Sequence, residues 1–200
     1  FPATLNINGM SGLIELPSGE SQADSKFTFS GTIIGNVSRG TFSFQFTERL
    51  SASFRFQTWR DWNTLFPEDD DLYRDRAMDL RYRILEESQY VPSLTVGLID
   101  FTGQGLFSSE YISATKTFGK KLKVTAGLGW GRLGSAGSIG SPFGDRPELE
   151  DSDKGKPNVE QWFRGEVSPF AGVEYKLNDR WTLKAEYSTD DYVLEDETRG

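Results

Sequence analysis

The chain contains no cysteine and no histidine among its 200 residues. Without cysteine it can form neither a disulfide framework nor a thiolate metal site. The lack of histidine excludes, within this chain, a Ser-His-Asp or Cys-His catalytic centre and a histidine-ligated zinc site. We therefore expect no cofactor and no metal centre.

Long apolar runs are also missing, because no stretch approaches the roughly 20 residues of a membrane-spanning helix. A basic tract is absent as well: 30 acidic residues outnumber 22 basic ones, and the net charge is -8. Phosphate binding needs clustered lysine and arginine, so nucleic acid is not an expected partner. What the chain does contain is 21 Gly, 15 Phe, 7 Tyr and 5 Trp, with an apolar content of only 36%. This composition favours β-structure in which apolar residues alternate with polar ones.

Apolar and polar residues alternate with a period of two along much of the chain. In "TFSFQF", for example, Phe42, Phe44 and Phe46 lie on one face, against Ser43 and Gln45 on the other. Such alternation predicts half-buried β-strands rather than helices. The predicted strands lie near residues 27–33, 41–46, 50–57, 78–84, 93–98, 111–118, 122–130, 167–177 and 181–187.

The connections between these strands alternate in length. Short turns fall near 47–49, 86–91, 119–121 and 178–180, whereas polar loops fall near 60–76, 102–108 and 132–161, with a short link at 35–40. Short periplasmic turns and long external loops are typical of outer-membrane β-barrels. Tryptophans near strand ends fit an interfacial aromatic belt. The candidate interface aromatics are Trp59, Trp130, Trp162 and Trp181.

We predict an all-β fold, an antiparallel transmembrane (outer-membrane) β-barrel with roughly nine strands in this chain. A soluble β-sandwich or small barrel is the alternative, since soluble antiparallel sheets alternate too. We expect residues 1–25 to lead into the barrel, 26–190 to form its strands, and 191–200 to be an acidic polar tail that is part of an external loop. With the N-terminus in the periplasm, the ninth strand ends outside. Because single-chain barrels normally have an even strand count, we expect further strands of the same or another chain to complete the barrel.

The polar face of the predicted strands would line the lumen of this barrel. It carries charges of both signs and the alternate glycines of "GLGWGRLG". Either a balanced wall that stabilises the barrel or a surface over which a hydrated glycan slides would fit. Glycine at alternate positions would leave this wall bare, which allows tight curvature or close approach of a chain or loop, so the stripe would serve either bending or passage. The candidate lumen-lining residues are Arg55, Asp79, Arg81, Arg83, Lys123, Gly127, Gly129, Gly131, Glu166, Glu174, Lys184 and Glu186.

Three motifs suggest other chemistry but are explained more simply. Gly129, Gly131 and Gly134 spell G-x-G-x-x-G, yet a polar loop rather than a helix follows, so a nucleotide site is not predicted. The acidic loops "FPEDDDLYRD" and "PELEDSD" lack the spacing of a calcium loop. Paired carboxylates from Glu166, Glu174 and Glu186 could be imagined in a glycosidase, but nothing in the sequence fixes two of them at a catalytic separation.

Four blocks of the sequence resemble the YjbH-like family of outer-membrane exopolysaccharide and capsule proteins. They are "GLIELP" (12–17), "LRYRILEESQYVPSLTVGLIDFTGQGLFSSEYISATKTFGK" (80–120), "GLGWGRLG" (127–134) and "AEYSTDDY" (185–192), in family order. The resemblance implies an outer-membrane β-barrel that accompanies exopolysaccharide or capsule export and has no known enzymatic activity. Family members are usually longer, and the resemblance supplies no catalytic or ligand residues.

We therefore predict a non-enzymatic barrel of the Gram-negative outer membrane that provides or supports a polar path for an exopolysaccharide or capsule. Its expected partners are membrane lipid, the polysaccharide, and other envelope or export proteins. The alternative is a non-conducting structural or scaffold barrel in a larger envelope secretion complex. A third hypothesis is a barrel enzyme that cleaves glycans with paired carboxylates.

Overall fold

A computed structural model describes residues 1–60, 72–102, 107–149 and 155–192 of the chain. Each segment in which alternation predicted a strand forms one. The strands are β1 (Phe27–Ile34), β2 (Val37–Gln45), β3 (Leu50–Arg60), β4 (Leu72–Leu85), β5 (Ser93–Ile99), β6 (Ser109–Phe118), β7 (Leu122–Gly131), β8 (Val167–Lys176) and β9 (Thr182–Tyr187). The described residues contain no α-helix, and two short 3-10 helices are η1 (Arg132–Gly134) and η3 (Val159–Gln161).

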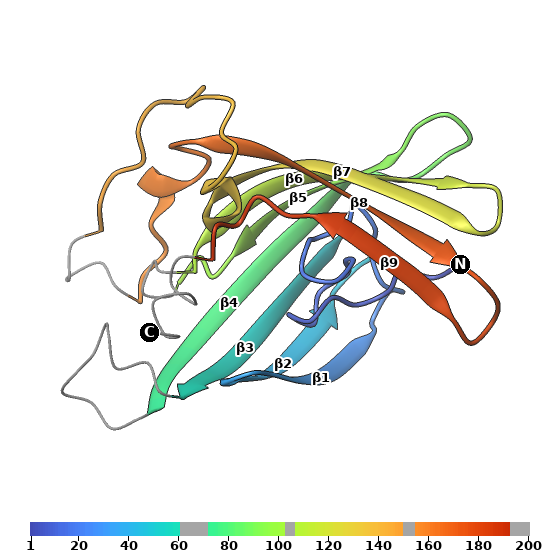
Figure 1. The fold of residues 1–200 in the computed structure, drawn as a ribbon, viewed down its shortest axis with the longest axis horizontal. Helices are drawn as coiled ribbons and strands as arrows, with labels where there is room; N and C mark the ends of the chain where they lie inside the picture. Colours follow the sequence, from blue (N-terminus) through green and yellow to red (C-terminus); the bar gives the residue numbers. More distant parts are fainter. Residues whose placement is uncertain (61–71, 103–106, 150–154, 193–200) are drawn as a thin grey trace.

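Every strand pairs antiparallel with the next one along the chain, which gives a single sheet in the order β1 to β9 (Figure 1). The sheet curves strongly, but β1 and β9 do not pair with each other among the described residues. The all-β antiparallel part of the prediction is thus confirmed. Closure into a barrel is not found in the described strands, whose two edges stay open.

Two connections differ from the expected ones. β4 begins at Leu72, so five residues assigned to the loop 60–76 extend the strand. The link expected over 35–40 shrinks to a two-residue turn, because β2 begins at Val37 and pairs there with Ile34. Gly35 has a φ of 55° in this turn, a left-handed conformation that glycine adopts without steric cost. Hydrophobic period alone did not show these strand ends, since both extensions mix polar and apolar residues.

The two faces of the sheet have opposite character. Large apolar side chains on the convex face are exposed, for example Phe29 at 62% and Phe54 at 41%. Charged side chains on the concave face are buried, for example Arg55 at 3% and Lys123 at 1%. This arrangement reverses that of a water-soluble protein, in which apolar side chains are covered and charges are solvated. The alternative of a soluble sandwich therefore receives no support from the described sheet.

Residues 1–25, hereafter the N-terminal segment, lie on the concave side of the sheet (Figure 1). Isolated bridges between Leu5 and Ser11 and between Gly12 and Pro17 fold this segment back on itself. Its apolar contribution is small. One buried cluster joins the segment to the sheet and contains Leu13, Leu16, Tyr111, Leu133 and Phe170.

The glycine row of β7 faces this cluster and is not bare. A side chain at Gly127 would meet the Phe170 ring, which lies opposite it on β8, and one at Gly129 would meet Leu133. Gly131 approaches the Ser108 carbonyl and has a φ of 63°. The close approach of other parts of the chain that the glycines were expected to allow is therefore found, and neighbouring residues occupy the space that the glycines leave.

No helix among the described residues is long and apolar enough to cross a membrane. Most of the acidic tail expected at 191–200 lies outside the described residues.

Candidate functional site

The concave side of the sheet, hereafter the inner face, gathers most of the charged residues that the sequence singled out. β3 contributes Arg55, β4 contributes three charged residues, and β7 to β9 contribute the rest. The exception is Glu166, which is exposed and precedes β8. The charged candidates on the inner face are Arg55, Asp79, Arg81, Arg83, Lys123, Glu174, Lys184 and Glu186.

β9 holds the N-terminal segment through main-chain groups. The Lys184 ammonium donates hydrogen bonds to the carbonyl oxygens of Leu5, Gly12 and Leu13 at 3.3, 3.0 and 2.6 Å. Two residues further along the same face, the Glu186 carboxylate accepts hydrogen bonds from the N–H groups of residues 14–16 at 2.9, 2.9 and 3.2 Å. One cation and one anion thus bind the carbonyl and amide groups of residues 12–16, and the cation also binds the Leu5 carbonyl.

Arg81 on β4 binds the same segment further along. Its guanidinium donates to the carbonyl oxygens of Ser11, Ser18 and Glu20 at 2.9, 2.8 and 2.5 Å. Arg81 is buried, and hydrogen bonds from a charged donor contribute roughly 1.5–3 kcal/mol each in proteins. The segment is therefore fastened from two distant strands.

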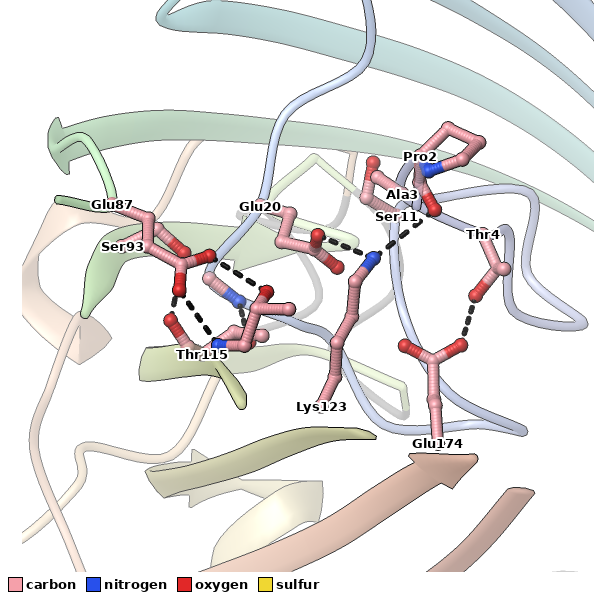
Figure 2. A network of polar contacts seen from close by, with 12 residues as sticks. Pro2, Ala3, Thr4, Ser11, Glu20, Glu87, Ser93, Thr115, Lys123 and Glu174 are labelled. Atoms are coloured by element: carbon pink, nitrogen blue, oxygen red, sulfur yellow. Dashed lines mark hydrogen bonds and ion pairs between the residues drawn. The ribbon is translucent and has the colours of Figure 1, made fainter. Parts of the chain in front are cut away.

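Lys123 on β7 lies between two parts of the N-terminal segment (Figure 2). Its ammonium is 2.7 Å from the Glu20 carboxylate, 3.1 Å from the Pro2 carbonyl and 4.0 Å from the centre of the Phe1 ring. Burial raises the pKa of Glu20, and the nearby Lys123 ammonium partly offsets this increase. The neighbouring Glu174 accepts a hydrogen bond from the Thr4 hydroxyl, also visible in Figure 2.

Arg55 and Asp79 form a buried ion pair on the inner face. The Arg55 Nη1 lies 3.3 Å from the Asp79 carboxylate, which also accepts hydrogen bonds from the Ser53 hydroxyl and the Asp100 N–H. Both carboxylate oxygens of Asp100 are buried without a hydrogen-bond partner. Burial, followed by repulsion from Asp75, raises the pKa of Asp100 to about 8.

The remaining candidates lie at the ends of the sheet. Arg83 is 3.8 Å from Glu86 at the β4–β5 turn. Trp181 is exposed beside the β8–β9 turn, whereas Trp162 is half-buried and meets the Phe101 ring edge-on.

Trp59 and Trp130 differ from the exposed aromatics that an interfacial belt would present. Trp59 lies on the inner face and stacks on Phe107 with ring centres 5.3 Å apart. Trp130 is 2% exposed because residues of the β7–β8 connection cover it, among them Phe143 and Phe163. The sequence placed both tryptophans near strand ends, where the structure has them. It did not show that Phe107 stacks on Trp59 or that the β7–β8 connection covers Trp130.

A cavity opens at the long-loop end of the inner face, hereafter the mouth cavity. It encloses about 600 Å³ of unfilled space continuous with solvent, and the N-terminal segment, β2, β3, η1 and the residues after β9 border it. Its polar lining includes Asn8, Glu15, Arg39, Arg55, Gln57, Arg132 and Asp190. Alternation placed Arg55 and Gln57 of this set on the polar face, and the other residues join them only through the fold.

Among the described residues, no group of three or more acidic side chains has an arrangement that could hold a metal ion. Glu174 and Glu186, considered above as part of a glycosidase pair, are occupied by contacts to the Thr4 hydroxyl and to main-chain N–H groups. Glu166 lies apart from them at the start of β8. Glu174 and Glu186 thus use their carboxylates to bind the N-terminal segment.

The sequence showed the charged wall but not the segment that fills it. Residues 1–25 have no alternation, and their contacts are to residues as many as 179 positions away, as between Leu5 and Lys184. A local signal was present in "GLIELPSGE", where glycine and proline interrupt any regular element. It indicated a folded loop without showing where the loop lies.

Comparison with known proteins adds an independent line of observation. The profile of the family described as "Exopolysaccharide biosynthesis protein YbjH" matches residues 4–199. The protein named "Uncharacterized lipoprotein YjbH" from Escherichia coli (strain K12) is 39% identical over 132 residues, which cover 62% of this chain and 18% of that relative. The chain therefore corresponds to only a small part of the relative's length.

No solved structure matches the chain. The family description concerns exopolysaccharide biosynthesis and names no reaction. With a match over nearly all of its residues, the chain belongs to the YjbH family of exopolysaccharide biosynthesis proteins.

Proposed function

We propose that this chain forms part of an outer-membrane β-barrel that supports export of an exopolysaccharide or capsule, and that it is not an enzyme. The observation that carries the proposal is the reversed polarity of the sheet, with exposed phenylalanines outside and buried charges inside. A lipid-facing apolar band and a polar interior are the two features of a transmembrane barrel. Membership of a family of exopolysaccharide biosynthesis proteins supports exopolysaccharide as the class of molecule that is exported.

Barrel closure would require partners for the two open edges. β1 and β9 are the terminal strands of the sheet, and unpaired edges within a membrane leave N–H and C=O groups unsatisfied. Further strands of the longer protein, or of another envelope protein, would pair with these edges. The matched relative is a lipoprotein by name, which is compatible with an envelope location for this chain as well.

The orientation follows from the connections. The N-terminus lies at the end of the sheet that carries the short turns β6–β7 and β8–β9 (Figure 1). Because short turns face the periplasm in outer-membrane barrels, the N-terminus would be periplasmic and the long loops external.

The membrane test uses a charge on the convex face of β3. In the full-length protein, Phe54→Arg combined with Phe56→Arg should abolish assembly, because arginine on a lipid face costs about 2–4 kcal/mol at the bilayer midplane. Assembly is measured as heat-modifiable, protease-resistant protein in the outer-membrane fraction. Tyr90→Arg, at a more exposed aromatic in the β4–β5 turn, is the control and should assemble normally. Equal assembly of both variants would contradict a lipid-facing convex side.

A second candidate function is a scaffold barrel that conducts nothing. The N-terminal segment favours it, because this segment occupies the inner face and is fastened by Lys184, Glu186 and Arg81. The two candidates differ in whether the inner face conducts once the segment is released, and in whether surface exopolysaccharide is lost when the segment cannot move.

A further inference from the structure

The mouth cavity brings three arginines together in an acidic chain. Arg39 of β2, Arg55 of β3 and Arg132 of η1 all line it, although the chain carries a net charge of -8. The carboxylates in its lining are those of Glu15 and Asp190. Three guanidinium groups from three separate elements therefore meet at one opening.

Two of these guanidinium groups are held in fixed planes. Arg132 pairs with the Asp190 carboxylate and lies over the Phe107 and Tyr192 rings, at 5.1 and 5.8 Å from the ring centres. Arg39 donates to the Gln57 side-chain oxygen at 3.2 Å and lies 5.7 Å from the centre of the Trp59 ring. Aromatic stacking and hydrogen bonds orient an arginine in advance, so that less freedom is lost when it binds a planar anion.

Arg55 has an unused donor. Its side chain is 3% exposed and its Nη1 pairs with Asp79, but its Nε has no hydrogen-bond partner. A buried donor without an acceptor costs roughly 1–3 kcal/mol. An acceptor supplied by a bound molecule in the cavity would remove this cost.

The rest of the lining suits a sugar. Asn8 and Gln57 offer amides, Ser109 and Ser188 offer hydroxyls, and no described residue of the lining other than Phe107 is aromatic. Amides and hydroxyls can both donate to and accept from sugar hydroxyl groups.

Building on the proposed function, we infer that the mouth cavity is a binding site for a carboxylate-bearing sugar unit of the exopolysaccharide. Arg39, Arg55 and Arg132 bind the carboxylate, for which the planar guanidinium fork is well matched. The amides of Asn8 and Gln57 bind ring hydroxyls. Because Asn8 and Glu15 belong to the N-terminal segment, the sugar contacts both the segment and the wall of the sheet.

Binding to the purified full-length protein in detergent tests the inference. Isothermal titration with an oligogalacturonate is compared with titration of a neutral maltooligosaccharide of equal length. The acidic oligomer should bind at least tenfold more tightly, and Arg39→Gln combined with Arg132→Gln should weaken its binding at least tenfold. Lys116→Gln, which removes a similarly exposed, ion-paired cation near the β4–β5 turn, should leave binding unchanged.

Asn8→Asp provides a variant that preserves the size of the side chain and leaves the arginines in place. The added negative charge should weaken binding of the acidic oligomer by a much larger factor than binding of the neutral one, which loses a single amide donor. This variant decides the matter if the arginine substitutions impair folding. Equal binding of both oligomers to the wild type, or unchanged acidic binding in Asn8→Asp, would overturn the inference.

The same preparations separate this inference from the proposed function. Protein that assembles in the outer membrane but does not distinguish acidic from neutral oligomers leaves the proposed function standing and removes the sugar site. Failure of the wild type to assemble in the outer membrane removes the proposed function itself, whatever the titration shows.

Discussion

At the scale of residues, the inner face holds the N-terminal segment mainly through main-chain groups. Lys184 and Arg81 each donate to three carbonyl oxygens, and Glu186 accepts from three consecutive N–H groups. Every residue offers these backbone groups, so docking of the N-terminal segment depends on its path more than on its side chains. The apolar exceptions are Leu13 and Leu16, which enter the small core.

Asp100 gives a pH-dependent prediction at the same scale. Its folded-state pKa, about 8, lies above the ordinary value of 3.8 because the carboxylate is buried beside Asp75. The folded state therefore binds a proton that the unfolded state releases. Stability from this group is complete below pH 3.8 and falls as the pH rises towards 8, by at most about 1.4 kcal/mol per pH unit.

Asp100→Asn should remove this dependence. Asparagine tolerates the left-handed φ of 51° at this position and stays neutral. Denaturant unfolding at several pH values should show the variant gaining on the wild type between about pH 4 and pH 8. The control is Asp179→Asn in the exposed β8–β9 turn, where hydrogen bonding to Lys176 lowers the pKa of the carboxyl. A pH-independent difference between Asp100→Asn and wild type would show that Asp100 is charged in the folded protein.

At the scale of elements, β7 shows how a strand can be predicted while its packing is not. The alternation of 122–130 defines the strand and its two faces, and β7 runs from Leu122 to Gly131. The residue that fills the space above Gly127 comes from β8, where Phe170 lies directly opposite. The pairing register therefore decides which neighbouring side chain fills the space beside a glycine in an alternating strand.

Gly127→Ala should destabilise the sheet. A Cβ there would collide with the Phe170 ring and approach the Ile112 carbonyl, and overpacking of this kind typically costs about 1–3 kcal/mol. Gly31→Ala on β1 is the matched control, because a Cβ there meets nothing within 4 Å. Chemical denaturation should show a lower midpoint for the first variant and an equal or higher one for the second. An unchanged midpoint for Gly127→Ala would mean that Phe170 can move aside at no cost.

At the scale of the whole molecule, the reversed polarity of the open sheet explains why the N-terminal segment fills its inner face. Buried charges on an inner face need partners, since an uncompensated buried ion costs several kcal/mol. The N-terminal segment provides them for Arg81, Lys123, Lys184 and Glu186. A path for a polysaccharide along this face would require the segment to leave it.

Release of the segment should therefore open the path. Lys184→Gln combined with Glu186→Gln keeps the net charge but replaces the two charges that hold the segment on β9. In planar bilayers, the full-length double variant should conduct several-fold more than wild type. Arg83→Gln, which changes an inner-face cation paired with Glu86 instead of the segment, should not. Conductance that stays at the wild-type level in the double variant would favour the scaffold over the export path.

The sequence by itself determined which segments form strands and which residues lie on each face of a strand. It also determined that one of these faces is charged. These features are local, because a two-residue period is written into eight or ten neighbouring positions and needs no distant partner. The sequence also contains the four blocks that resemble the YjbH-like family, and the family match confirms that the chain belongs to it.

Only the tertiary structure decided what covers the inner face and which side chains meet at its mouth. Leu13 contacts Lys184 from 171 positions away, and Arg132 meets Asp190 across 58. Such meetings depend on the curvature of the sheet and on the register of every strand between, which no local pattern encodes. For the same physical reason Trp59 and Trp130, correctly placed at strand ends, are buried by partners that only the fold supplies.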